Sequence, residues 1–221
     1  MSVHVALIHY PVYNRHGQVI VSAVTNLDIH DIARAARTYG VSRFYVVTPL
    51  EDQRKLVQRL LSHWLEGHGA RAHPERKMAL ELVTPVASLT EVVAAIAHEE
   101  GRQPELLATG ATAAVPTLSY GEARERIQQG RPILILFGTG WGLSSEVLSL
   151  ATYQLDPIHG TSGYNHLSVR GAAAIILDRL LGRRDETEER VPLLEPMTRI
   201  GEESQGAART RFPEQSGRNE V

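Results

Sequence analysis

The sequence predicts an α/β fold, with a mostly parallel sheet and helices on both of its faces. Short apolar runs alternate with stretches of helical periodicity about 10 to 15 residues long, which is the pattern of βαβ units. Capping and turn residues stand at the boundaries. A chain of 221 residues, 43% of them hydrophobic, can bury a core of its own. We expect one domain over residues 1–182 and a flexible charged tail over residues 183–221.

The first half of the chain predicts three strands and two helices. The first apolar run ends at Tyr10-Pro11 and has the pattern of a strand buried on both faces. A segment with apolar or small residues at helical spacing follows and stops at Gly40, a typical residue after a helix C-terminus. The expected strands are Val3–Ile8, Phe44–Thr48 and Ala79–Val83, and the expected helices are Asp28–Tyr39 and Glu51–Glu66.

Two capping boxes mark helices in the second half. Glutamate follows serine by three residues at Ser88 and at Ser119, and these helices run to about Glu100 and Gly130. The remaining expected elements are strands at Leu106–Thr109 and Pro132–Phe137 and a last helix over residues 168–181. Because the carboxyl ends of parallel strands share one edge of a sheet, ligand-binding loops are expected after Ile8, Thr109 and Phe137 and before Ser168.

Composition excludes several classes of protein. The chain has no cysteine, so disulfides, thiol catalysis and cysteine zinc sites are excluded. It has no apolar run near the roughly 20 residues that span a bilayer, and its start lacks a signal-peptide pattern, so we expect a cytoplasmic protein. His63, His68 and His73 recur at a spacing that suits neither a helix face nor a zinc site, so no metal is expected. The net charge of −2 does not by itself indicate a basic surface that would bind nucleic acid.

The most informative segment is Leu136–Leu143, with glycines at 138, 140 and 142 directly after a buried strand. Missing β-carbons allow a planar or phosphorylated ligand to approach the backbone, which favours a nucleotide-like ligand over a merely tight turn. A dinucleotide-binding oxidoreductase, with Asp156 on a ribose, is one alternative. Its fingerprint requires a glycine where Leu143 stands, and it usually opens the first βαβ unit.

A second segment, Gly163–Ala174, leads into the last helix. Ser168 is a candidate N-cap, and Asn165 and His166 place polar groups at the helix mouth. Taken alone, the segment is equally explained by a capped helix with small residues at an interface.

Together, Phe137–Leu143 and Tyr164–Ala173 resemble the second and third motifs of the SPOUT superfamily of S-adenosylmethionine-dependent RNA methyltransferases. Asp28 to Gly40, with Arg34, is similar to the first motif of its SpoU branch, which has asparagine where Asp28 stands. The resemblance covers about residues 1–182. It is strongest to a small single-domain group, some members of which are fused to a tRNA guanine methyltransferase.

The resemblance implies a trefoil knot over about residues 136–180 and a homodimer formed through the first and last helices, whose small residues are Ala33, Ala35, Ala36 and Ala172 to Ala174. It implies a tRNA or rRNA substrate and direct methyl transfer from S-adenosylmethionine. The implied cofactor-binding residues are Thr109, Gly110, Leu136, Gly138, Thr139, Gly140, Trp141, Gly142, Leu143, Ile158, Asn165, His166, Leu167 and Ser168.

For catalysis, the resemblance makes Arg34 the candidate for holding a phosphate of the acceptor, with Asp28 and Asn26 as helpers beside His30 and Asp31. Arg54, Lys55 and Arg59 form either part of an RNA-facing surface or a solvated helix face. A non-catalytic module that binds cofactor or RNA is a third hypothesis.

Overall fold

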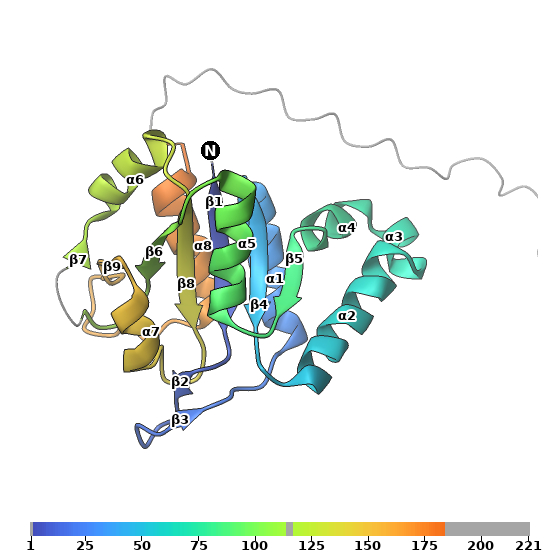
Figure 1. The fold of residues 1–221 in the computed structure, drawn as a ribbon, viewed down its shortest axis with the longest axis horizontal. Helices are drawn as coiled ribbons and strands as arrows, with labels where there is room; N and C mark the ends of the chain where they lie inside the picture. Colours follow the sequence, from blue (N-terminus) through green and yellow to red (C-terminus); the bar gives the residue numbers. More distant parts are fainter. Residues whose placement is uncertain (1, 114–116, 184–221) are drawn as a thin grey trace, which may run out of the picture. The chain divides into compact units, whose positions relative to one another are not determined.

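The computed structural model of the chain describes residues 2–113 and 117–183. Its centre is a seven-stranded sheet in the order β5-β4-β1-β8-β6-β9-β7, in which every pairing is parallel (Figure 1). The strands are β1 (Val3–Ile8), β4 (Arg43–Val47), β5 (Val83–Val86), β6 (Glu105–Ala108), β7 (Thr117–Leu118), β8 (Ile133–Gly138) and β9 (Tyr153–Leu155). A separate antiparallel hairpin pairs β2 (Val12–Tyr13) with β3 (Val19–Ile20). The predicted fold class is confirmed.

Helices cover both faces of the sheet. They are α1 (Asn26–Thr38), α2 (Glu51–Leu65), α3 (His68–Ala72), α4 (Pro74–Leu80), α5 (Leu89–Glu100), α6 (Tyr120–Gln128), α7 (Ser145–Leu150) and α8 (Val169–Leu181). Because side chains alternate along a strand, Val5 and Leu7 of β1 pack with α1, α2, α4, α6 and α8, whereas Ala6 and Ile8 pack with α5 and α7. No described helix is long and apolar enough to cross a bilayer.

Helix boundaries follow the capping residues. Ser88 and Ser119 are N-caps, and at Ser119 the reciprocal box with Glu122 is complete. Gly40 follows α1 with φ of +70°, the left-handed conformation that glycine adopts without strain.

One predicted strand is partly wrong. Ala79 and Leu80 end α4, and the strand begins only at Val83. A short apolar run does not distinguish a strand from the buried face of a short helix, and Pro74 in the first turn favours the helix. The short elements α3, α4, α7, β2, β3, β7 and β9 were not predicted.

The sheet brings three loops to one edge. β1, β8 and β6 are adjacent and parallel, so the chain leaves Ile8, Gly138 and Ala108 at the same carboxyl edge, where the β2–β3 hairpin also lies (Figure 1). After β8 the chain returns to the sheet as β9, on the far side of β6. The knot over residues 136–180 stays a prediction.

Candidate functional site

The glycine-rich loop after β8 is held against the β2–β3 hairpin by its own backbone. The Trp141 N–H donates to the Tyr13 carbonyl at 2.8 Å, and the Tyr13 N–H donates to the Gly142 carbonyl at 2.9 Å. Within the loop, the Gly142 N–H donates to the Thr139 carbonyl at 3.1 Å. These bonds hold the loop in a tight turn with one side against the hairpin.

The three glycines of the loop have different surroundings. A β-carbon on Gly138 would lie 2.8 Å from the Leu143 backbone nitrogen, and one on Gly140 would lie 2.7 Å from the Tyr13 carbonyl oxygen. At Gly142, with φ of +109°, nothing lies within 4 Å of that position. The first two glycines therefore admit the chain's own backbone, and Gly142 is the one that leaves open space for a ligand.

A partly buried chain of hydrogen bonds joins this loop to His9. Thr139 Oγ1 donates to the Ile8 carbonyl at 2.9 Å and lies 2.5 Å from Ser22 Oγ, which lies 3.0 Å from His9 Nδ1. With Thr139 donating to Ile8, the 2.5 Å contact is formed by Ser22 donating to Thr139, and it is shorter than the 3.4 Å from Ser22 Oγ to the His9 carbonyl. In this arrangement His9 Nδ1 donates to Ser22. This places the proton of neutral His9 on Nδ1.

His9 is fully buried, and its Nε2 has no hydrogen-bond partner among the described residues. Burial lowers the pKa of His9 to about 4, against the opposing effect of the Asp28 carboxylate. His9 is therefore neutral near pH 7. No sequence motif points to His9, Ser22 or Tyr13, although His9 directly follows a strand after which a ligand-binding loop is expected.

The loops after β6 and before α8 join the same edge. The Thr109 hydroxyl and N–H both donate to the Leu136 carbonyl, at 2.9 and 3.1 Å. Asn165 Nδ2 donates to the Ala111 carbonyl at 2.6 Å, which ties the segment before α8 to the loop after β6. Ser168 caps α8 by accepting from the Gly171 N–H at 3.2 Å. The loop after β6 is thus bonded both to strand β8 and to the segment before α8.

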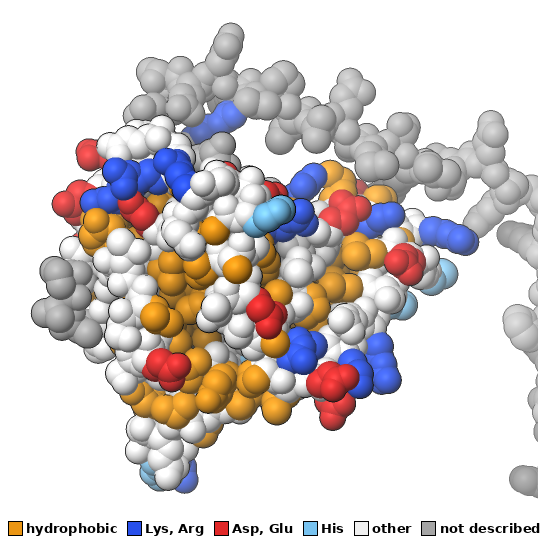
Figure 2. Space-filling model, viewed as in Figure 1, with side chains coloured by type: hydrophobic (Ala, Val, Ile, Leu, Met, Phe, Trp, Pro, Cys, Tyr) orange, Lys and Arg blue, Asp and Glu red, His pale blue; other side chains and the backbone are white. Residues whose placement is uncertain are grey.

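Several of these side chains are open to solvent. Trp141 is 70% exposed, Tyr164 is 69% exposed and Leu167 is 44% exposed, whereas Leu136 and Leu143 are buried and Ile158 packs partly buried against the core. The ring of His166 meets that of Tyr164 edge-on at 5.6 Å. On the face seen in Figure 2, hydrophobic side chains also gather along the lower border of the molecule.

The predicted catalytic residues on α1 do not form one cluster. Arg170 of α8 pairs with Asp28 at 3.3 Å and with Asp31 at 3.4 Å, and Asp28 also accepts from the Thr25 hydroxyl at 2.7 Å. Asn26 is exposed in the first turn, and Arg34 is exposed two turns further on, about 12 Å along the axis. Asp28 is therefore engaged in joining α1 to α8, and the Arg34 guanidinium has no hydrogen bond or ion pair to a described residue.

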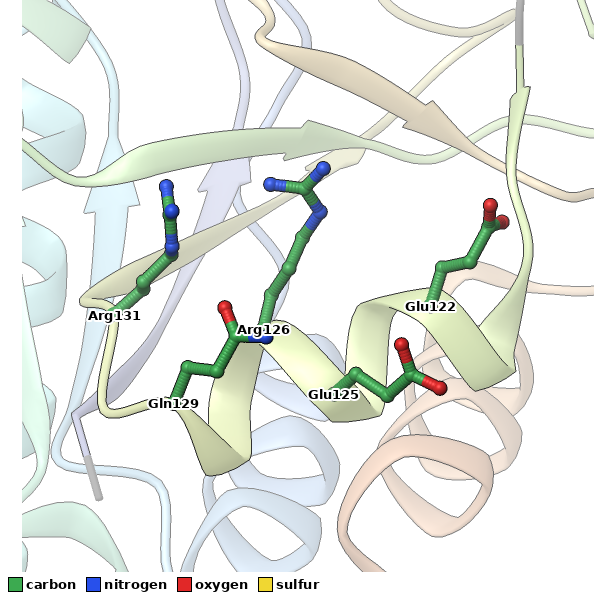
Figure 3. A pocket seen from close by; sticks show the side chains of 5 residues that line it. All are labelled: Glu122, Glu125, Arg126, Gln129 and Arg131. Carbon is green, nitrogen blue, oxygen red and sulfur yellow. The ribbon is translucent and has the colours of Figure 1, made fainter.

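A hollow beside α6 lies near the amino ends of β6 and β8, at the opposite end of these strands from the loops described above. It is lined by Glu122, Glu125, Arg126, Gln129 and Arg131 (Figure 3). Its two arginines both pair with Glu105, at 3.2 and 2.5 Å, and Arg126 also covers the ring of Tyr153. Because both arginines are paired within the chain, they are not available to a ligand, and we do not assign a binding role to this hollow. Within residues 2–113 and 117–183, no group of three His, Asp or Glu side chains is placed to hold a metal.

Comparison with known proteins adds a family. A family model described as SAM-dependent RNA methyltransferase matches residues 2–182. A tRNA (guanine-N(1)-)-methyltransferase from Oleidesulfovibrio alaskensis is 45% identical over 181 residues, which are 82% of this chain and 42% of that protein. The chain thus spans less than half of that relative. An uncharacterized protein from Aquifex aeolicus is 43% identical over 82% of this chain and 89% of its own length.

Solved structures show the same fold at low identity. A putative methylase family protein from Neisseria gonorrhoeae has a TM-score of 0.56 at 16% identity, covering 88% of this chain and 87% of that one. The SpoU methyltransferase AviRb from Streptomyces viridochromogenes has a TM-score of 0.51 at 19% identity, covering 81% of this chain and 58% of that one.

Proposed function

Because the chain belongs to the family of SAM-dependent RNA methyltransferases, we propose that it binds S-adenosylmethionine at the carboxyl edge of the sheet and methylates a base or ribose of tRNA or rRNA directly. The observation that carries the proposal is the convergence of three loops there, 109–112, 138–143 and 165–168, each fixed by its own hydrogen bonds. The open space at Gly142 and the exposed ring of Trp141 suit a planar nucleoside-like group.

When bound, S-adenosylmethionine supplies an electrophilic methyl group on its sulfonium. The residues of this chain would orient the cofactor and exclude water from it. Backbone groups of Thr109, Gly110 and the glycine loop would surround the bound nucleoside, and Asn165 to Ser168 would close one side of the site. Arg34 holds a phosphate of the acceptor RNA. Such positioning in line is the main contribution of the protein, since the cofactor already carries the reactive group. With no cysteine in the chain, the methyl group is not relayed through sulfur.

Calorimetric titration tests this proposal. We expect S-adenosylhomocysteine, the product form of the cofactor, to bind and NAD not to bind. Gly140→Arg abolishes binding, because even a β-carbon there meets the Tyr13 carbonyl oxygen at 2.7 Å. Gly101→Arg is the matched control, at a positive-φ glycine with open space after α5. Tight NAD binding would favour the oxidoreductase, although the six-residue helix α7 offers little of the long helix that a dinucleotide fold uses.

Catalysis is tested separately by methyl labelling. Total RNA from a strain that lacks the gene is incubated with the protein and labelled S-adenosylmethionine, and the labelled nucleotide is mapped. If cofactor binds and no label enters RNA, the chain is a binding module instead. We infer the cytoplasm as its compartment, since tRNA and rRNA are found there.

We also propose a homodimer, whose interface includes fewer of the small residues of the first and last helices than the sequence indicates. Ala33, Ala36 and Ala173 are fully buried in the chain's own core, so they cannot contact a partner. The outer faces of α1 and α8 remain, which pack side by side and include the exposed Leu27 and Ala174. Sedimentation of the wild type and of Leu27→Glu tests this, and a monomeric wild type would contradict it.

A further inference from the structure

A shallow groove of about 490 Å³ lies between α1 and α2, outside the loops described above. Its lining residues are Asn26, His30, Leu56, Arg59, Leu60, His63 and Trp64. None of them is a carboxylate. The groove begins at Asn26, in the first turn of α1, and therefore opens near the carboxyl edge of the sheet where the proposed active site lies.

Arg59 differs from the two other cations of α2. Arg54 donates to the Thr48 carbonyl at 2.8 Å, and Lys55 pairs with Glu51 at 2.8 Å. The Arg59 guanidinium forms no hydrogen bond or ion pair with a described residue and is exposed in the groove. A cation without an internal partner is available to an anion from outside.

Two further arginines extend the positive charge. Arg34 lies one turn after His30 on the same side of α1, since residues four apart share a helix face. Arg76 of α4 covers the ring of Trp64 at 4.7 Å. Burial and the charges of Arg76 and Arg34 lower the pKa of His30, with Asp31 opposing. Both guanidinium charges therefore act on the groove wall.

The groove also has a fixed apolar wall and floor. Trp64 is held between Arg76 and Gly69, where a β-carbon would lie 2.7 Å from the indole. The rings of His30 and His63 meet it nearly edge-on at 5.3 and 5.2 Å. Leu56, 46% exposed, and Leu60 form the adjoining floor. This surface combines unpaired guanidinium groups with an apolar bed, as nucleic-acid surfaces do.

We propose that this groove binds the sugar-phosphate backbone of the RNA substrate next to the active site, with Arg59 and Arg34 on phosphates and Leu56 and Leu60 beneath a ribose or an unstacked base. The inference rests on the proposed function and adds the path of the RNA. The homodimer proposed above uses the outer faces of α1 and α8 and not this groove, because a two-fold contact through the groove would bring the same positive side chains together. A near-neutral protein can hold RNA through such a local patch.

Binding of fluorescein-labelled bulk tRNA, followed by anisotropy, tests the groove. Arg59→Glu is expected to weaken binding about tenfold or more, and Arg59→Ala to lower the slope of log K against log salt by about 1. Lys55→Glu is the matched control, with the same charge change one turn earlier on α2 and outside the lining. It should stay within about threefold of wild type, since exposed charges are screened. Equal losses in the two variants would overturn the inference.

The two tryptophans give an independent readout. Trp141→Phe leaves Trp64 as the chain's one tryptophan, so tRNA should change its emission and S-adenosylhomocysteine should not. If the emission of Trp64 does not change when tRNA is added, the proposal that the groove binds RNA is overturned. Displacement of tRNA by polyglutamate at equal charge would assign the groove to an acidic protein instead. A change of oligomeric state in Arg59→Glu would assign it to contact between copies.

The cofactor arm separates this inference from the proposed function. Wild type and Arg59→Glu should bind S-adenosylhomocysteine equally, because Arg59 lies outside the cofactor loops. Suppose that both proteins bind S-adenosylhomocysteine, that the wild type methylates RNA, and that Arg59→Glu binds tRNA as tightly as the wild type. In that case the groove inference fails and the proposed function stands. If the wild type does not bind S-adenosylhomocysteine, the proposed function fails, whatever the tRNA result.

Discussion

At the scale of single residues, His9 couples the glycine loop to pH. Its pKa is about 4 in the folded chain and near 6.5 when unfolded, so the unfolded state takes up a proton first as pH falls. The stability that neutral His9 contributes is complete above pH 6.5 and is lost as pH falls towards 4, by about 3 kcal/mol at most. Urea unfolding between pH 4 and 8 should show this decline.

His9→Asn is the matching variant, because the asparagine amide can donate to Ser22 Oγ without a group that titrates. Its unfolding free energy should depend less on pH than that of wild type. Burial also lowers the pKa of His4 and His30, which add the same trend to both proteins, so the difference between the two curves isolates His9. Parallel curves would show that the buried imidazole does not set the slope.

Gly140 tests whether the hairpin contact shapes the cofactor loop. Gly140→Ala introduces a β-carbon at positive φ, which costs about 1 to 2 kcal/mol, and a further clash with the Tyr13 carbonyl oxygen. Gly130→Ala has the same φ strain in open space after α6 and serves as control. We expect Gly140→Ala alone to weaken S-adenosylhomocysteine binding, by about tenfold or more, in calorimetry. Equal affinities would mean that the loop binds no cofactor.

At the scale of elements, periodicity predicted the long strands and helices, because each buries one continuous apolar surface. It missed β2, β3, β7 and β9, which have two or three residues each. β2 and β3 pair with each other in a hairpin, whereas β7 and β9 pair between segments distant in the chain. The rule for parallel sheets placed the loops after β1, β6 and β8 at the carboxyl edge, as the structure has them, and their role in ligand binding stays a prediction. The pairing of Arg170 with Asp28 and the His9–Ser22–Thr139 chain join residues more than 100 positions apart, which no local pattern encodes.

The contact between α1 and α8 distinguishes a positioning role of Asp28 from a chemical one. If Asp28 acts through its 3.3 Å pair with Arg170, then Asp28→Asn and Arg170→Gln should lower methyl transfer by similar factors, and the double variant should be no worse than either. If Asp28 takes part in proton transfer, its loss should exceed that of Arg170→Gln and add to it. Rates at saturating cofactor for the four proteins decide between the two.

At the scale of the whole molecule, net charge conceals where the cations lie. Four cations form ion pairs with described carboxylates: Arg126 and Arg131 pair with Glu105, Lys55 pairs with Glu51, and Arg170 pairs with two aspartates. Arg34 and Arg59 lack such partners among the described residues. A formal charge of −2 is therefore compatible with an RNA-binding surface, which the composition by itself did not indicate.

The predicted tail gives the last test at this scale. Residues 184–221, which lie outside the described part of the chain, include nine acidic and six basic residues, so the segment adds net negative charge to a chain that is proposed to bind RNA. A truncation after Arg183 should therefore bind bulk tRNA about two- to fivefold more tightly at 50 mM salt, and the gain should vanish near 0.5 M salt, where the Debye length is only a few ångströms. Its affinity for S-adenosylhomocysteine and its unfolding midpoint should match those of the full chain, since residues 1–182 are expected to fold as one domain. A lower midpoint would show that residues beyond Arg183 contribute to the core, and weaker tRNA binding would show that the segment contacts RNA instead of repelling it.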